Sequence, residues 1–247
     1  MDTAGLVVYA IASFFVSVLG GMSGGGGGFI MTPLTIFLGL SPAQAVATGK
    51  LGGLSVTLGS LHGLRKAKLH SWKVVVPISL MALVIGVVAP LAIVNLDAEV
   101  YKRTLGVLLL LMVPIMLFKK VGHQKREVSK GYKIAGYTAL AVAMSLQAVF
   151  SGGLGTLVNM ALMGLLGMSA LEANVTKRFS QVVLNGVISL ALIGTDLIVW
   201  EVALVGAFTA FLGGVIGAHL AIKKGDVFVT RIFVIFMIFA AAELLLG

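Results

Sequence analysis

Residues 23–50 read SGGGGGFIMTPLTIFLGLSPAQAVATGK, and much of the organisation of the chain can be inferred from them. Five consecutive glycines, Gly24–Gly28, come first, and an apolar segment over 29–40 follows. A helix of about twelve residues rises about 18 Å, which is little more than half of a hydrocarbon core about 30 Å thick. The segment after the glycines is therefore too short to cross a membrane by itself.

A helix-start signature ends this short segment. In Ser41-Pro42-Ala43-Gln44, the serine oxygen can accept the amide of the third helical position, the glutamine can reach back to the cap amide, and proline suits the first helical position. A second stretch, 151–178, has the same order in SGGLGTLVNMALMGLLGMSALEANVTKR, with a capping box at Ser169–Glu172. Both stretches predict a broken segment followed by a new helix.

The two stretches belong to an internal repeat. A shift of 128 positions places Ser23 on Ser151 and Trp72 on Trp200, and no insertion is needed over nearly a hundred residues. The same shift pairs Lys50 with Arg178. We interpret the chain as two copies of one unit.

The composition assigns this unit to a membrane. Of the 247 residues, 59% are hydrophobic and 11% are charged, whereas a soluble domain averages roughly 45–50% apolar and about 25% charged residues. At about 20 apolar residues per crossing, the chain has material for roughly eight to ten membrane segments. We therefore expect an all-α polytopic membrane protein in contact with the lipid bilayer, and the composition excludes a soluble enzyme or a nucleic-acid-binding domain. The absence of cysteine excludes thiolate metal sites and cysteine nucleophiles.

The net charge of +9 is a topology signal, because Lys and Arg concentrate in cytoplasmic connections. The basic connections are 65–73, 119–133 and, more weakly, 223–231, whereas 95–103 and 195–201 are mixed or acidic. The first half then starts outside and ends inside, and the second half does the reverse. We predict a first membrane repeat over 1–118, a basic cytoplasmic linker over 119–133 and a second, inverted membrane repeat over 134–247.

Inverted repeats are the recurrent architecture of secondary transporters, because two similar units of opposite orientation can open a central site to either side. We expect each repeat to hold about five helical segments, including a broken or re-entrant hairpin. A static duplicated scaffold is the alternative. The sequence leaves open whether each hairpin is re-entrant or a pair of short full crossings.

The hairpins predict an anion site. Helix N-termini carry partial positive charge and unpaired N–H donors, so the two capped helix starts would attract an anion if they converge near the membrane midplane. Glycine amides can approach a small ligand closely. A helix break that only serves packing is the alternative reading of Gly24–Gly28.

Cations in the same elements favour this interpretation. Lys50, Lys177 and Arg178 lie about two turns after the capping serines, inside apolar stretches, where ionisable residues are costly. Snorkelling of these side chains to a headgroup is the alternative. The predicted substrate-binding residues are Ser23, Gly24, Gly25, Gly27, Ser41, Thr48 and Lys50 in the first repeat, and Ser151, Gly152, Gly153, Asn174, Thr176, Arg178 and Gln181 in the second.

The pattern resembles the TauE/SafE sulfite-exporter family of membrane permeases. The resemblance rests on the glycine run after the first helix, on Pro33 and Gly39-Leu40-Ser41-Pro42, and on the weaker second copy, which has Leu154 and Thr156 where the first has Gly26 and Gly28. It covers essentially the whole chain. It implies a transporter of small sulfur-containing anions, often an exporter, in the cytoplasmic (inner) membrane of a bacterium or archaeon.

We therefore expect a secondary transporter of an anion such as sulfite or an organosulfonate. A passive anion channel or uniporter remains an alternative, because the only acids plausibly at membrane depth are Glu172 and Glu243. An intramembrane hydrolase is disfavoured because the nine acids lie mostly in connections, so we expect no catalytic residues, metal or cofactor. The expected partners are a small anionic substrate and the bilayer, without nucleic acid, and a homodimer is left open.

Overall fold

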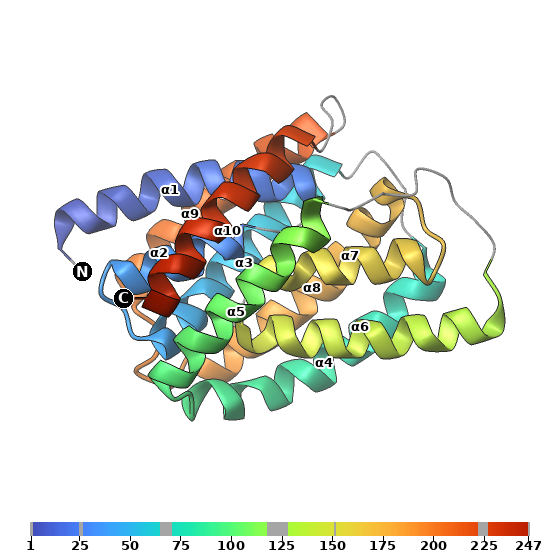
Figure 1. The fold of residues 1–247 in the computed structure, drawn as a ribbon, viewed down its shortest axis with the longest axis horizontal. Helices are drawn as coiled ribbons and strands as arrows, with labels where there is room; N and C mark the ends of the chain where they lie inside the picture. Colours follow the sequence, from blue (N-terminus) through green and yellow to red (C-terminus); the bar gives the residue numbers. More distant parts are fainter. Residues whose placement is uncertain are drawn as a thin grey trace.

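The computed structural model of the chain describes residues 2–24, 27–64, 71–117, 128–150, 152–221 and 227–246. These residues form ten α-helices and one short 3-10 helix, and no strand occurs among them. The elements are α1 (Thr3–Ser23), α2 (Gly28–Phe37), α3 (Pro42–Leu64), α4 (Trp72–Val94), α5 (Ala98–Leu117), α6 (Lys130–Phe150), η1 (Gly152–Leu154), α7 (Gly155–Gly164), α8 (Ala170–Leu192), α9 (Trp200–Ala221) and α10 (Val227–Leu246). The all-α prediction is confirmed, and Figure 1 shows the helices gathered in one bundle.

The two halves repeat the same series of helices. α1 and α6 each contain 21 residues, α2 and α7 each contain 10, and α3 and α8 each contain 23. The packing also corresponds, because α3 packs on α9 as α8 packs on α4, and α3 and α8 pack on each other. The order, length and packing of the helices are thus compatible with the repeat inferred from the sequence.

Corresponding helices run in opposite directions. In Figure 1 the chain runs from left to right in α1 and α3, and from right to left in α6 and α8. Both termini lie at the left, and the helix ends that flank 65–70, 118–127 and 222–226 lie toward the right. This arrangement is compatible with the predicted inversion. Most of the basic linker falls outside the described residues, and α6 begins within its predicted range, at Lys130.

Both capping signatures start long helices. The Ser41 amide donates to Gln44 Oε1 over 3.1 Å, and the Gln44 amide donates to Ser41 Oγ over 3.3 Å. The Glu172 amide donates to Ser169 Oγ over 3.3 Å. The two helix starts lie toward opposite ends of the bundle in Figure 1. They do not converge, contrary to our expectation, because α3 and α8 each have the length of a full crossing.

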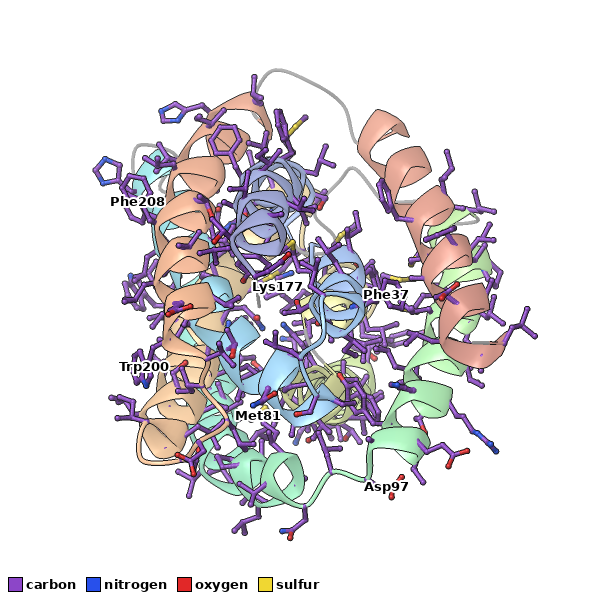
Figure 2. All side chains as sticks on the ribbon, turned by 90° about the vertical axis from the view of Figure 1, so that its left-hand side faces the viewer. Phe37, Met81, Asp97, Lys177, Trp200 and Phe208 are labelled. Carbon is purple, nitrogen blue, oxygen red and sulfur yellow. The ribbon has the colours of Figure 1, made fainter. Side chains whose placement is uncertain are left out.

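Apolar side chains cover much of the outside of the bundle. Four of the described helices, α1, α4, α6 and α9, are long and apolar enough to cross a membrane. On α4, Leu80, Val84 and Leu91 are exposed, and on α9 Leu204 and Phe208 are exposed. Figure 2 shows Phe208 at the periphery and Lys177 in the interior. Exposed apolar side chains around a polar interior suit a lipid environment.

Glycine allows α1, α9 and α3 to approach closely. A Cβ on Gly217 of α9 would overlap the carbonyl oxygen of Val18 on α1, and a Cβ on Gly59 of α3 would overlap the carbonyl oxygen of Phe211 on α9. Small residues let membrane helices pack backbone to backbone. This contact holds α1 against the central helices and so forms one wall of the candidate site.

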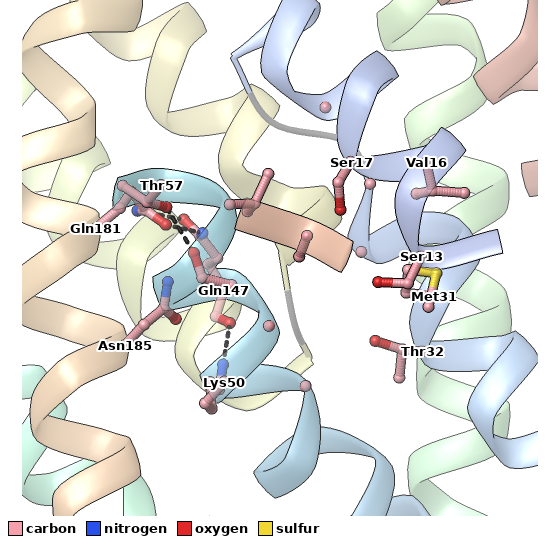
Figure 3. Close-up of a pocket in the computed structure, with 18 of the residues that line it drawn as sticks. Ser13, Val16, Ser17, Met31, Thr32, Lys50, Thr57, Gln147, Gln181 and Asn185 are labelled. Atoms are coloured by element: carbon pink, nitrogen blue, oxygen red, sulfur yellow. Dashed lines mark hydrogen bonds between the residues drawn. The ribbon is translucent and has the colours of Figure 1, made fainter. Parts of the chain in front are cut away.

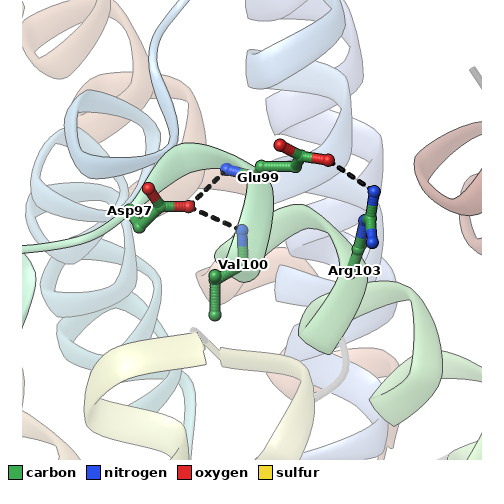
Figure 4. A network of polar contacts seen from close by, with 4 residues as sticks. All are labelled: Asp97, Glu99, Val100 and Arg103. Atoms are coloured by element: carbon green, nitrogen blue, oxygen red, sulfur yellow. Dashed lines mark hydrogen bonds and ion pairs between the residues drawn. The ribbon is translucent and has the colours of Figure 1, made fainter.

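The connection between α4 and α5 shows an ordinary exposed polar network (Figure 4). Asp97 Oδ1 accepts the amides of Glu99 and Val100 over 3.0 and 2.8 Å, as a helix-capping aspartate does. One turn later, Arg103 Nη2 lies 2.5 Å from Glu99 Oε1. Both partners of this ion pair are largely exposed.

Candidate functional site

A cavity of about 130 Å³ lies between α1, α2, α3 and α8. Gln147 of α6 and Ala210 of α9 complete its lining. Figure 3 shows two sides of it: Ser13, Ser17 and Thr32 lie on one, and Lys50, Gln147 and Asn185 lie on the other. Helices of both halves therefore enclose the same space, α1, α2 and α3 from the first and α6, α8 and α9 from the second.

The glycine-rich break forms part of this cavity. Gly24, Gly27 and Gly28 line it, and the short helix α2 begins there. Gly24 follows α1 with a φ of 75°, and a Cβ at this position would overlap the Asn174 side chain. Glycine suits this position because it adopts a positive φ without strain and because it has no Cβ to collide with Asn174. The helix N-terminus that faces the cavity is thus that of α2, whereas we had expected the N-termini of α3 and α8.

Three cationic side chains line the cavity from α3 and α8. Lys50, Lys177 and Arg178 are 3%, 2% and 4% exposed. Lys50 Nζ donates to the Gln147 carbonyl oxygen over 3.1 Å, and Arg178 Nη2 donates to the Gly21 carbonyl oxygen over 2.8 Å. Their burial excludes snorkelling to a headgroup as the explanation of these side chains.

The hydrogen bonds of Lys50 and Arg178 follow the repeat. Each cation sits at the same position of the third helix of its half, and each donates to a carbonyl near the C-terminal end of the first helix of the other half. Helix C-termini carry partial negative charge, so these carbonyls stabilise the buried cations. Lys177 Nζ similarly donates to the carbonyl oxygens of Gly24 and Gly155.

These cations lie in a region without buried acids. None of the buried polar or charged residues in the described part of the chain is Asp or Glu, and no carboxylate lines the cavity there. Glu172 is half-buried at the first turn of α8, and Glu243 is exposed on α10. Among the described residues, the polar partners of these three side chains are carbonyl and carboxamide oxygens, not carboxylates. The lining is therefore rich in cationic hydrogen-bond donors and has no negatively charged partner for them there.

Amide side chains extend the same wall. The carboxamides of Gln147 and Gln181 bond reciprocally, with nitrogen-to-oxygen distances of 2.5 and 3.0 Å. Arg178 Nε donates to Asn174 Oδ1 over 3.0 Å, which orients the guanidinium. Asn185 faces the cavity and is largely buried, and its side chain makes no hydrogen bond with another described residue. Its carboxamide is available to a ligand.

The opposite wall carries hydroxyl groups that our sequence reasoning missed. Ser13 and Ser17 of α1 and Thr32 of α2 line the cavity, as does Tyr9. The hydroxyl groups of Ser17 and Thr32 make no hydrogen bond within the described part of the chain. The sequence does carry a signal for these residues, because Tyr9, Ser13 and Ser17 recur every four residues on an otherwise apolar helix and so share one face.

Several predicted site residues lie elsewhere. The predicted residues that line the cavity are Gly24, Gly27, Lys50, Arg178 and Gln181. Asn174 does not line it, but it accepts a hydrogen bond from Arg178, which does. Ser41 is exposed at its helix start. The remaining predicted residues outside the lining are Ser23, Thr48, Gly152, Gly153 and Thr176, and Gly25 and Ser151 lie outside the described residues.

The two threonines instead join the repeats. Thr48 Oγ1 accepts the Val199 amide over 3.1 Å, and Thr176 Oγ1 accepts the Ser71 amide over 3.4 Å. The shift of 128 positions maps one bond onto the other. Gly153 has a different role, because a Cβ there would overlap the ring of Phe29. The second break therefore packs directly against α2 of the first half.

The site offers donors rather than metal ligands. No group of three or more His, Cys, Asp or Glu side chains that could hold a metal ion is found among the described residues. Ammonium, guanidinium, carboxamide and hydroxyl groups are hydrogen-bond donors suited to an oxyanion. The arrangement can bind a small anion and shield it from lipid.

Comparisons with known proteins find similar membrane proteins. A family model described as sulfite exporter TauE/SafE matches residues 9–244. The chain is 26% identical over 240 residues to the "Probable membrane transporter protein" of Haemophilus influenzae, covering 95% of this chain and 90% of that protein. It is 24% identical over 245 residues to the "Probable membrane transporter protein YfcA" of Escherichia coli K12, covering 94% and 88% of the two chains. No solved structure matches the chain.

Proposed function

Since the chain belongs to the sulfite exporter TauE/SafE family, a family of membrane transporters, we propose that it is a secondary transporter that exports a small sulfur-containing anion such as sulfite or an organosulfonate. The cavity between α1, α2, α3 and α8 is the proposed binding site. The residues proposed to bind the anion there are Lys50, Arg178, Gln181 and the glycines of the first break, together with the hydroxyl groups of Ser13, Ser17 and Thr32.

One observation carries the proposal. Lys50, Lys177 and Arg178 are buried around one cavity, and no buried acid accompanies them in the described part of the chain. A buried cation without a counter-ion is costly, so a site that collects three of them favours the entry of an anion. Charge-assisted hydrogen bonds to an oxyanion would offset that cost.

The size of the cavity supports a compact ligand. A protein cavity of about 150 Å³ holds benzene, and this cavity measures about 130 Å³. Sulfite has fewer heavy atoms than benzene, whereas sulfoacetate has more. Sulfite is therefore compact enough for a cavity of this volume.

Binding by purified protein tests the proposal. Thermal unfolding would be followed with sulfite, sulfate, thiosulfate, sulfoacetate, phosphate and chloride at fixed ionic strength and pH. A ligand at 100 times its Kd stabilises the folded state by about 2.7 kcal/mol. We expect sulfite to raise the Tm and chloride to leave it unchanged. Equal shifts with all anions, or none with any sulfur oxyanion, would contradict the proposal.

A uniporter or passive channel is the second candidate. The observation that supports it over a proton-coupled transporter is that the described lining of the cavity contains no acid and no histidine to carry a coupling proton. The membrane potential, inside negative, drives anion export by about 2.3 kcal/mol per charge per 100 mV. Efflux from proteoliposomes that follows the potential and ignores a pH gradient would support uniport, and stimulation of that efflux by external sulfite would distinguish a carrier from a channel.

The orientation is also part of the proposal. The helix ends that flank the basic connections lie toward one end of the bundle in Figure 1, and basic connections face the cytoplasm. We place this end, including the linker 119–133, on the cytoplasmic side of the inner membrane. The termini and the acidic connections would then face outward.

A further inference from the structure

Each half contains a break in its helices, between α1 and α2 in the first half and between α6 and α7 in the second. Lys177 differs from the other two cations because it contacts both breaks. Its ammonium donates to the carbonyl oxygen of Gly24, at the end of α1, and to that of Gly155, which begins α7, the latter over 3.1 Å. Asn159 Nδ2 adds a bond to the same Gly24 oxygen over 3.4 Å. One buried side chain thus ties the discontinuity of the first repeat to that of the second.

This connection has no equivalent in the first repeat. The position that corresponds to Lys177 is Gly49, which has no side chain. Lys50 and Arg178 each donate to a carbonyl in a single first helix, α6 or α1. Within the described residues, Lys177 is therefore the one cation of the cavity whose hydrogen bonds reach both breaks. The repeat supplies no cation at the equivalent position of the first half.

Lys177 also lines the cavity, so its ammonium is within reach of a ligand there. A carbonyl group is a neutral dipole, whereas an oxyanion carries full charge. The present bonds are charged only on the donor side, whereas a bond from the ammonium to an oxyanion would be charged on both sides and would add the attraction between two full charges. An oxyanion in the cavity therefore competes with Gly24 and Gly155 for the same ammonium.

We propose that Lys177 is a substrate-responsive latch. In the empty protein its ammonium holds the two breaks together, and an arriving oxyanion draws the ammonium away and frees both breaks to rearrange. This inference rests on the proposed function, because it takes the ligand to be an anion in this cavity. It adds that binding loosens the breaks, whereas simple ligand binding would only rigidify them.

Hydrogen–deuterium exchange of the full chain tests the latch. We would follow backbone amides of 27–31 and 155–159, the first turns of α2 and α7, with and without saturating sulfite. We expect sulfite to accelerate exchange in both segments at least about tenfold while it raises the global Tm. Exchange that slows, or stays unchanged, in the sulfite-bound protein would overturn the latch.

Variants separate the latch from charge alone. Lys177→Met should exchange at least about tenfold faster than the parent without any anion, and Lys177→Arg should stay as slow as the parent. Lys50→Met is the matched control, because it removes a buried cation of the same cavity that does not join the breaks. Its empty form should exchange slowly. Equally fast exchange in the two methionine variants would contradict the latch.

The thermal shift with sulfite keeps the two proposals distinguishable. If sulfite stabilises the parent but does not change exchange at the breaks, the latch fails and the proposed function stands. If sulfite does not bind, the proposed function fails. Slow exchange in folded Lys177→Met without anion would separately show that the Lys177 hydrogen bonds do not hold the two breaks together.

Discussion

At the scale of single residues, the buried cations donate hydrogen bonds to main-chain carbonyl oxygens. Arg178 reaches the Gly21 carbonyl and Lys50 reaches the Gln147 carbonyl, each across the boundary between the repeats. A carboxylate partner would neutralise the charge, whereas a carbonyl leaves most of it available. The choice of partner therefore keeps the site stable without filling it.

Arg178→Met should remove most of the anion affinity. The guanidinium is oriented by Asn174 and lines the cavity, and truncation of one partner of a buried charged pair costs about 2–5 kcal/mol. Titration of sulfite into the purified variant would measure this loss. An unchanged Kd in a folded variant would remove Arg178 from the site.

Arg103→Met is the matched control. This side chain pairs with Glu99 at 2.5 Å, but both partners are largely exposed (Figure 4). Exposed pairs contribute about 0–1 kcal/mol. The Tm should therefore move little and the Kd for sulfite should not change. A loss of affinity here equal to that of Arg178→Met would show that bulk charge, rather than the cavity, governs binding.

The sequence was sufficient to find some site residues but not their partners. Lys50 and Arg178 could be predicted because a cation inside an apolar stretch stands out and because the repeat aligns them. The carbonyls of Gly21, Gly24 and Gln147 could not be predicted, since every residue has a carbonyl and its direction depends on packing. The hydroxyls of Ser13 and Ser17 could have been found from their spacing along α1.

At the scale of elements, local signals located helix starts well. The capping boxes at Ser41 and Ser169 mark the beginnings of α3 and α8. Where these starts lie in space did not follow, because a capping box fixes one turn of helix and says nothing about depth. The faces of α4 and α9 were equally hard to predict, since helices that are apolar all round carry no periodicity.

Ser41→Ala should weaken the start of α3. The substitution removes the oxygen that accepts the Gln44 amide, and loss of a serine cap costs about 1 kcal/mol. Thermal unfolding in the same detergent would measure the change. Gln44→Ala, which removes the reciprocal bond from the Ser41 amide, should cost a similar or smaller amount. No loss in either variant would mean that the exposed turn does not depend on its cap.

Gly217→Ala should destabilise the contact between α1 and α9. The added Cβ would overlap the Val18 carbonyl, and overpacking of a tight contact costs about 1–3 kcal/mol. Gly186→Ala is the control, because the nearest atom to its added Cβ, Leu54 Cδ1, is 3.9 Å away. In a helix interior that change should be neutral or stabilising by up to about 1 kcal/mol. A loss at Gly186 as large as that at Gly217 would contradict the role of this close contact, because helix propensity alone would stabilise both variants.

At the scale of the whole molecule, the repeat is visible in contacts that no single helix reveals. Thr48 accepts the amide of Val199 and Thr176 accepts that of Ser71, so the same bond is made twice across the centre. The repeat could be inferred from the sequence because its alignment needs no insertion, and these two bonds are compatible with it. The sequence could not predict that the two threonines would connect the halves, since either residue alone suits a ligand equally well.

Single cysteines test the inversion of the two halves. The chain contains no native cysteine, and Ala43 and Ala170 lie in the first turns of α3 and α8. We expect Ala43→Cys to react with a membrane-impermeant maleimide from outside intact cells, and Ala170→Cys to react only after the membrane is opened. Equal labelling of both from one side would contradict the inverted orientation.

The carbonyl partners of the buried cations also bear on the turnover cycle. The proposed exporter would have to return through the membrane without a bound anion, and Lys50, Lys177 and Arg178 each have a carbonyl oxygen partner within the chain itself. The return step then leaves no cation stripped of all partners. We therefore expect the proposed carrier to be capable of net efflux as well as one-for-one exchange, so loaded vesicles should empty into a medium that contains no anion substrate.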